Sequence, residues 1–212
     1  MLNLHNEVCA PGPDRKQMRR EAFLAHAGAV LVSLGLNRAT MDDIAQSAGV
    51  SKVILYRFFS SKEKLISTLL ETISDRLVSQ IESPWRGVGP DIESILDIAR
   101  QDSNAFILLM KHAPHDPTYG LYPEKVRDAS VRRTKLLTRS IWKHLTDPRI
   151  RELSCEAVVT FLMDATLRWI ERGEPKDDHI FVAWTLDTTN ALYSRWESGQ
   201  VTPPPGPLPL PL

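Results

Sequence analysis

The sequence predicts an all-α protein: an N-terminal three-helix unit followed by a larger helical body. Two observations carry this prediction. Apolar residues recur at steps of three and four along most of the chain, which is the period of an amphipathic helix. Glycine and proline interrupt these patterns at helix-length intervals, and we find neither an internal repeat nor the apolar–polar alternation of a half-buried strand.

Composition narrows the class of protein. The chain has 212 residues, of which 42% are hydrophobic and 25% charged, as in an ordinary soluble globular protein. It holds no run of about 18 uncharged apolar residues and no secretory signal at its start, so we expect a cytoplasmic protein without a membrane partner. Its two cysteines, Cys9 and Cys155, are too few for a disulfide framework or a four-ligand zinc site.

The charges are unevenly distributed along the chain. Residues 15–64 hold nine Lys or Arg against four Asp or Glu, a net charge of +5, whereas the remainder carries −5. A basic N-terminal part on an acidic body favours a polyanionic partner. Charge alone would fit a solvated surface equally well.

The chain opens with an arm that has no helical period. Residues 1–14 contain Pro11 and Pro13 and predict a flexible N-terminal arm. From residue 15 to about residue 34 the apolar side chains follow a helical period, and Gly35 is a typical C-terminal stop.

Two short helices are expected next. Thr40 suits an N-cap, because Asp42 and Asp43 in the first turn favour the helix dipole, and this helix ends at Gly49. Ser51 caps a third helix that extends to about residue 59.

Longer helices make up the expected body. Ser61 caps a fourth helix with an apolar stripe from Leu65 to Ile81, and Pro and Gly break the pattern over 83–90. Further helices are predicted at about 91–112, 123–145, 149–172 and 178–197. The pattern divides the chain into an N-terminal helical unit over 15–61, a helical body over 62–200 and a Pro-rich disordered tail over 201–212.

The functional assignment rests on the two short helices. They are joined by Ala-Gly-Val-Ser, which is the arrangement of a helix-turn-helix, and Gly49 suits the turn because it adopts a positive φ without strain. Ile44, Ala45 and Leu55 are small or branched apolar residues that lock such helices together. The second helix of this motif enters the DNA major groove.

The whole segment resembles the TetR family of bacterial transcriptional regulators. The resemblance covers about residues 15–70 and is carried by Thr40, Ile44-Ala45, Ala48-Gly49-Val50-Ser51, Leu55-Tyr56, Phe59, Ser61-Lys62-Glu63 and Leu65. It implies a three-helix DNA-binding head and a helical body that dimerises through its last two helices. Such a body often holds a small-molecule effector.

The resemblance also implies which residues contact DNA. Thr40, Tyr56 and Lys62 match positions that contact phosphates, and these contacts position the head. The start of the third helix faces the groove. The predicted DNA-contacting residues are Thr40, Ser51, Lys52, Val53, Ile54, Tyr56, Arg57 and Lys62.

The third helix departs from the family pattern at three positions. Val53 and Ile54 stand where small or hydroxyl residues are usual, and they can pack on a thymine methyl group if they face the groove. Lys52 can reach O6 or N7 of guanine. Phe58 replaces a His or Tyr and cannot donate a hydrogen bond, and its place in core or surface stays open, whereas Phe59 is expected in the core.

Two segments near the C-terminus predict a dimer. Residues 157–170 hold ten apolar residues of fourteen and residues 180–193 hold nine, so each helix must bury more than one face. Two such helices per subunit make an isologous four-helix bundle, the alternative being a monomer in which both are central. The predicted interface residues are Val159, Leu162, Trp169, Phe181, Trp184 and Tyr193.

An effector pocket is a further hypothesis. Its expected wall, for an apolar or amphipathic small molecule, consists of Trp85, Phe106, Met110, Trp142 and Met163, although such residues also make plain core. His112, His115 and Asp116 favour a metal only weakly, and we expect neither metal nor cofactor.

The predicted function is a DNA-binding transcriptional regulator. An enzyme is disfavoured because the chain lacks a Gly-rich phosphate loop, a Gly-x-Ser-x-Gly elbow and a His-Glu-x-x-His pair. A helical interaction module without DNA binding is a third reading. We expect a homodimer that represses from a palindromic operator and is released by a small molecule, with activation left open.

Overall fold

The computed structural model describes residues 15–84, 91–141 and 147–198. Within these ranges every regular element is a helix, which confirms the all-α prediction. None of the helices in these ranges is long and apolar enough to cross a bilayer. The chain divides into two compact units after Ile66, whereas the sequence placed the boundary after residue 61.

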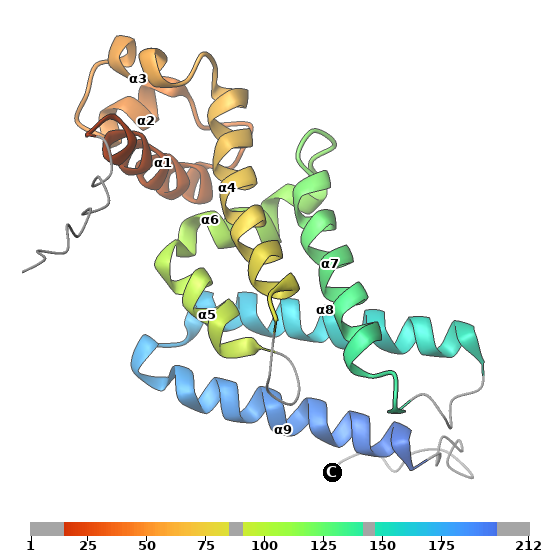
Figure 1. Cartoon of the computed structure of the whole chain (residues 1–212). Coiled ribbons are helices and arrows are strands. Elements are labelled where there is room, and N and C mark those ends of the chain that lie inside the picture. The colour runs from red at the N-terminus through yellow and green to blue at the C-terminus, as the bar shows by residue number, and fades with distance from the viewer. Residues whose placement is uncertain (1–14, 85–90, 142–146, 199–212) are drawn as a thin grey trace, which may run out of the picture. The chain divides into compact units, whose positions relative to one another are not determined.

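Helices α1 (Arg15–Leu34), α2 (Met41–Ser47) and α3 (Lys52–Phe58) belong to the first unit, together with the first residues of α4 (Lys62–Glu82) (Figure 1). Gly35 has a φ of 86° and its N–H donates to the carbonyl of Leu31, which ends α1 where the sequence predicted.

The start of α2 is fixed by a capping box. The Thr40 hydroxyl accepts the N–H of Asp43 at 3.2 Å, and Oδ2 of Asp43 accepts the N–H of Thr40 at 2.8 Å. Gly49 has a φ of 65° at the turn into α3, as predicted. Ser51 occupies the N-cap position of α3, as predicted, but its side chain makes no capping hydrogen bond.

Aromatic side chains pack the first unit. Phe59 is 1% exposed, as predicted, and the guanidinium of Arg20 lies 5.3 Å from its ring centroid. Phe58 packs against Phe23 with ring centroids 5.0 Å apart and planes at 80°. This edge-to-face contact gives Phe58 a structural role.

The second unit holds the rest of α4 and all later elements. These are α5 (Ile92–Gln101), α6 (Ser103–Ile107), the π-helix η1 (Leu108–His112), the 3-10 helix η2 (Ala113–His115), α7 (Leu121–Leu137), α8 (Pro148–Arg172), the 3-10 helix η4 (Pro175–Asp177) and α9 (Asp178–Glu197). Figure 1 shows α8 and α9 as the two long C-terminal helices.

Two predicted helices differ from the observed ones. The single helix expected over 91–112 is interrupted at Asp102, whose carboxylate accepts the N–H of Ala105 at 3.1 Å and so starts a new helix. The helix expected over 123–145 begins at Leu121 and ends at Leu137.

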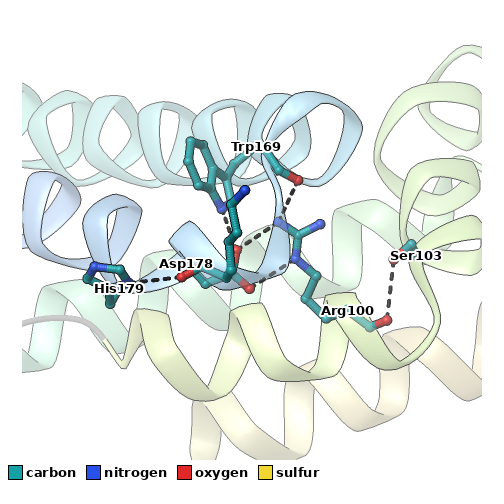
Figure 2. Close-up of polar contacts among 7 residues, drawn as sticks. Arg100, Ser103, Trp169, Asp178 and His179 are labelled. Atoms are coloured by element: carbon teal, nitrogen blue, oxygen red, sulfur yellow. Dashed lines mark hydrogen bonds and ion pairs between the residues drawn. The ribbon is translucent and has the colours of Figure 1, made fainter.

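A partly buried ion pair ties α5 to the start of α9 (Figure 2). Nε and Nη2 of Arg100 donate to the two carboxylate oxygens of Asp178 at 3.0 and 2.7 Å, and Nη2 also donates to the carbonyl of Gly173. Nε1 of Trp169 donates to the same carboxylate at 2.6 Å. Burial raises the pKa of Asp178, but the hydrogen bonds from Arg100 and Trp169 outweigh it and lower this pKa below its usual value.

Candidate functional site

The outer face of α3 is exposed and carries both apolar and polar side chains. Val53 is 65% exposed and Tyr56 43% exposed, whereas Leu55 is fully buried against the rest of the first unit. Arg57 is also exposed, and Ile54 is half-buried. The expected groove-reading positions are therefore at the surface, except that Ile54 is partly committed to packing.

Lys52 is paired with a residue of the preceding helix. Its ammonium donates to Oδ2 of Asp42 at 2.7 Å, and both side chains are largely exposed. The hydrogen bond from this ammonium to Asp42 raises the pKa of Lys52, so the side chain is charged at neutral pH. Sequence reasoning gave Lys52 a role but did not find its partner.

Thr40 is committed to the cap of α2. Its hydroxyl donates to Oδ2 of Asp43 at 2.7 Å while accepting the N–H of the same residue. Hydrogen bonds from Thr40 lower the pKa of Asp43, which keeps the carboxylate charged at the helix N-terminus. Any phosphate contact by Thr40 must replace its bond to Asp43 and stays a prediction.

Lys62 lies in a different environment from the expected one. Its ammonium donates to the carbonyls of Leu36 and Ala39, each at 2.9 Å, and to that of Asn37 at 3.4 Å. These bonds hold the loop between α1 and α2, so the structure gives Lys62 an internal role. The expected phosphate contact would require the ammonium to leave these three carbonyls.

A basic groove was missed by the sequence reading. Arg15, Lys16 and Arg19 of α1 and Arg57 of α3 line an open groove of about 910 Å³ beside Phe58. The spacing of Arg15 and Arg19, four residues apart, places both on one face of α1 and is the signal that could have found the groove. It adds positive charge next to the exposed face of α3.

A second candidate site is a cavity of about 570 Å³ in the second unit. The predicted wall residues Phe106, Met110 and Met163 line it. Trp85 and Trp142, also predicted for the wall, lie outside the described residues. Most of the wall is apolar, and its charged members are Asp91, Arg133 and Glu197.

The helices predicted to form the dimer interface use many of their apolar residues internally. Val159 is 1% exposed and Phe181 4% exposed, and Trp169 stacks on Phe181 with ring centroids 5.2 Å apart. Leu162 and Tyr193 line the cavity. Val159 and Phe181 are therefore buried within the subunit, whereas an interface role for the partly exposed Leu162, Trp169 and Tyr193 stays a prediction.

Other residues of α8 and α9 remain at the surface. Trp184, the sixth predicted residue, is 50% exposed, and its ring lies 5.6 Å from that of Phe161 on the neighbouring helix. Leu153 and Ile180 are 59% and 55% exposed. The sequence analysis did not assign either residue to the interface. Both are apolar and lie on helices predicted to bury more than one face, which was the available signal.

The segment that holds His112, His115 and Asp116 does not form a metal site. In the part of the chain that the structure covers, no group of three His, Cys, Asp or Glu side chains is arranged to hold a metal ion.

Comparison with known proteins decides the family. Residues 23–69, which include α2 and α3, match the description "Bacterial regulatory proteins, tetR family". The chain therefore carries a TetR-family domain over these residues. Members of this family are DNA-binding transcription regulators, and two relatives of this chain are named as a transcriptional activator and a transcriptional repressor.

Several curated relatives are similar to this regulator. The transcriptional activator FasR of Mycolicibacterium smegmatis is 26% identical over 79% of the chain and 80% of the relative. The transcriptional repressor TetR of Mycobacteroides abscessus is 29% identical over 63% of each protein. The nucleoid occlusion factor SlmA of Haemophilus influenzae is 34% identical, but over only 37% of the chain and 39% of the relative.

Solved structures share the fold of the regulator. A TetR-like transcriptional regulator from Rhodococcus sp. RHA1 superimposes with a TM-score of 0.68 at 21% identity, over 89% of this chain and all of that one. GusR of Salmonella enterica gives a TM-score of 0.59 at 16% identity, over 91% of this chain and all of that one.

Proposed function

We propose that this regulator represses transcription in the cytoplasm by binding a palindromic operator as a homodimer, and that a small molecule in the body cavity releases it. The observation that carries the proposal is the helix-turn-helix of α2 and α3, in which α3 buries Leu55 and exposes Val53 and Tyr56. A recognition helix needs this division between a packed face and an accessible one.

Contacts to DNA are divided between base reading and positioning. Lys52 and Val53 are the proposed base-reading side chains, the first for a guanine and the second for a thymine methyl group. Tyr56, Arg57 and the basic groove lined by Arg15 and Arg19 are proposed to contact phosphates. This division predicts a half-site that combines a G·C pair with neighbouring A·T pairs.

Exposed apolar residues support dimerisation through α8 and α9. Leu153, Ile180 and Trp184 would bury their surfaces against a second copy of the same helices, and burying such side chains favours association by about 25 cal/mol per Å². A two-fold axis through this interface would present two recognition helices, which accounts for a palindromic operator.

Release by a ligand is proposed to act through α4. Lys62 at its start holds the loop before α2, and Leu77 and Ile81 near its end line the cavity. A ligand that binds one position of α4 better than another shifts the population of the two positions. The affinity for the operator changes only to the extent of that difference.

The sign of regulation is proposed as repression. Among the relatives, the TetR protein of Mycobacteroides abscessus is named a repressor and FasR an activator. A reporter gene placed behind the operator distinguishes the two: deletion of the regulator raises expression if it represses and lowers expression if it activates.

A gel-shift experiment tests the DNA-binding proposal itself. Purified regulator is mixed with the DNA upstream of its own gene and with a fragment of equal length from inside a coding sequence. We expect a discrete complex on the first fragment that persists against excess competitor DNA. Equal affinity for both fragments would contradict sequence-specific binding.

A further inference from the structure

Arg133 differs from the other basic side chains of α7. Lys125, Arg132 and Lys135 form ion pairs with Asp75, Glu82 and Glu152, and Arg127 donates to Thr160. Arg133 is half-buried in the wall of the cavity and makes no ion pair or hydrogen bond with the described residues. A guanidinium withdrawn from water without a counter-charge is unfavourable.

Tyr193 supplies a second donor from α9. It also lines the cavity, and its ring packs against that of Trp196 with centroids 5.9 Å apart. Its hydroxyl makes no hydrogen bond with the described residues. Burial raises the pKa of Tyr193 to about 12, so the hydroxyl keeps its proton at neutral pH and remains a donor.

The two acids in the cavity wall are placed differently. The carboxylate of Asp91 already accepts hydrogen bonds from Nε2 of Gln80 at 2.7 Å and from the N–H of Ser94 at 3.3 Å. The second of these bonds caps α5. Glu197 is exposed near the end of α9. Arg133 is therefore the charged wall residue with the most hydrogen-bonding capacity left to offer a ligand.

We propose that the cavity binds an amphipathic carboxylic acid, whose carboxylate pairs with Arg133 and accepts a hydrogen bond from Tyr193 while its apolar chain packs on Phe106 and Met163. A guanidinium and a carboxylate match in shape and charge, and such hydrogen bonds are about twice as strong as neutral ones. One water molecule occupies about 30 Å³ in liquid water. If each non-hydrogen atom of a ligand takes a similar volume, the cavity holds roughly 19 such atoms.

This inference specifies the ligand of the proposed effector site. Only its consequence for DNA binding rests on the proposed function. The test uses three ligands with the same ten-carbon chain: decanoate, decan-1-ol and decylamine. Their binding to the full-length regulator is measured by calorimetry at pH 7, below the concentrations at which they aggregate. We expect decanoate to bind at least about 10-fold more tightly than either of the others.

Variants assign the selectivity to the guanidinium. Arg133→Met is expected to weaken decanoate binding about 10-fold or more and to leave decan-1-ol unchanged. Arg132→Met is the matched control, because it removes the same charge from the preceding residue, which pairs with Glu82. Arg133→Lys is expected to bind decanoate more tightly than Arg133→Met does but more weakly than wild type. Tyr193→Phe is expected to weaken decanoate binding by a smaller factor than Arg133→Met. These two variants test the site if Arg133→Met does not fold.

The outcomes separate this inference from the proposed function. Equal binding of the three ligands, preference for decylamine, or equal effects of Arg133→Met and Arg132→Met would each overturn it. The same titrations are repeated with operator DNA present. If decanoate binds through Arg133 but leaves the operator complex intact, the assignment of the carboxylate site stands and the proposed release by a ligand fails.

Discussion

The ammonium of Lys52 lies 2.7 Å from a carboxylate oxygen of Asp42, so the side chain expected to read a base is held by the preceding helix. An exposed ion pair of this kind contributes little to stability. Operator DNA can therefore displace Asp42 at small cost. The carboxylate of Asp42 would then lie unpaired beside the DNA and repel nearby phosphates.

The first prediction concerns Lys52 and Asp42 as a pair. Lys52→Ala is expected to weaken operator binding about 10-fold or more and to relax the preference at one base pair. Asp42→Asn is expected to strengthen binding both to random-sequence DNA and to the operator, because it removes a negative charge near the phosphates. Fluorescence anisotropy with both DNAs measures the effects, and an unchanged base preference in Lys52→Ala would refute the assignment.

The second prediction separates Lys62 from Tyr56. Lys62→Ala is expected to lower the unfolding free energy by about 1–3 kcal/mol, because three carbonyls lose a charged donor. Tyr56→Phe is expected to leave stability unchanged and to weaken specific and non-specific DNA binding alike. Urea denaturation and anisotropy titrations distinguish them. If Lys62→Ala keeps full stability and reduces the salt slope by about one unit, the phosphate role is correct instead.

The third prediction concerns the dimer. Light scattering at micromolar concentration is expected to give about twice the chain mass of 23.9 kDa. Trp184→Asp should then dissociate the dimer while the subunit stays folded, because this side chain is 50% exposed. Val159→Asp should instead unfold the subunit, because its side chain is 1% exposed and a charge there lacks a partner. Circular dichroism and scattering separate the two effects, and a wild-type mass of one subunit would exclude this interface.

The sequence predicted the local structure of the first unit well because short-range chemistry controls it. Gly35 and Gly49 adopt the positive φ that glycine permits, and Thr40 caps α2 through a residue three positions away. The interruption at Asp102 was missed because an apolar period can continue through a residue that starts a new helix.

Long-range partners could not be predicted in the same way. A helical period shows which residues are apolar but not which residues cover them. Val159 was therefore predicted to contact a partner subunit, although it lines the cavity within its own subunit. The bonds of Lys62 join residues more than twenty positions apart. Such contacts depend on how the loop after α1 lies against the start of α4, which no local pattern encodes.

The fourth prediction uses the Arg100–Asp178 pair. The folded protein lowers the pKa of Asp178, so this carboxylate contributes stability above its usual pKa of 3.8 and loses that contribution as the pH falls through the folded value. Asp178→Asn is expected to cost about 1–3 kcal/mol at pH 7 and progressively less below about pH 4. Urea denaturation across this range measures the difference from wild type.

An exposed pair provides the control for this prediction. Asp164 pairs with Arg168 one turn away on α8, and both side chains are more than half exposed. Asp164→Asn should therefore leave stability nearly unchanged at every pH. A constant difference between Asp178→Asn and wild type from pH 7 to pH 3 would show that the pair does not act through the charge of this carboxylate.

The most direct test of the account is selection of binding sites from random double-stranded DNA by the full-length regulator, followed by sequencing. The central claim is that two copies of α3 read DNA related by a two-fold axis. We predict an enriched near-palindrome in which each half-site carries a G·C pair beside A·T pairs. Enrichment of a non-palindromic sequence, or of no sequence at all, would contradict this claim.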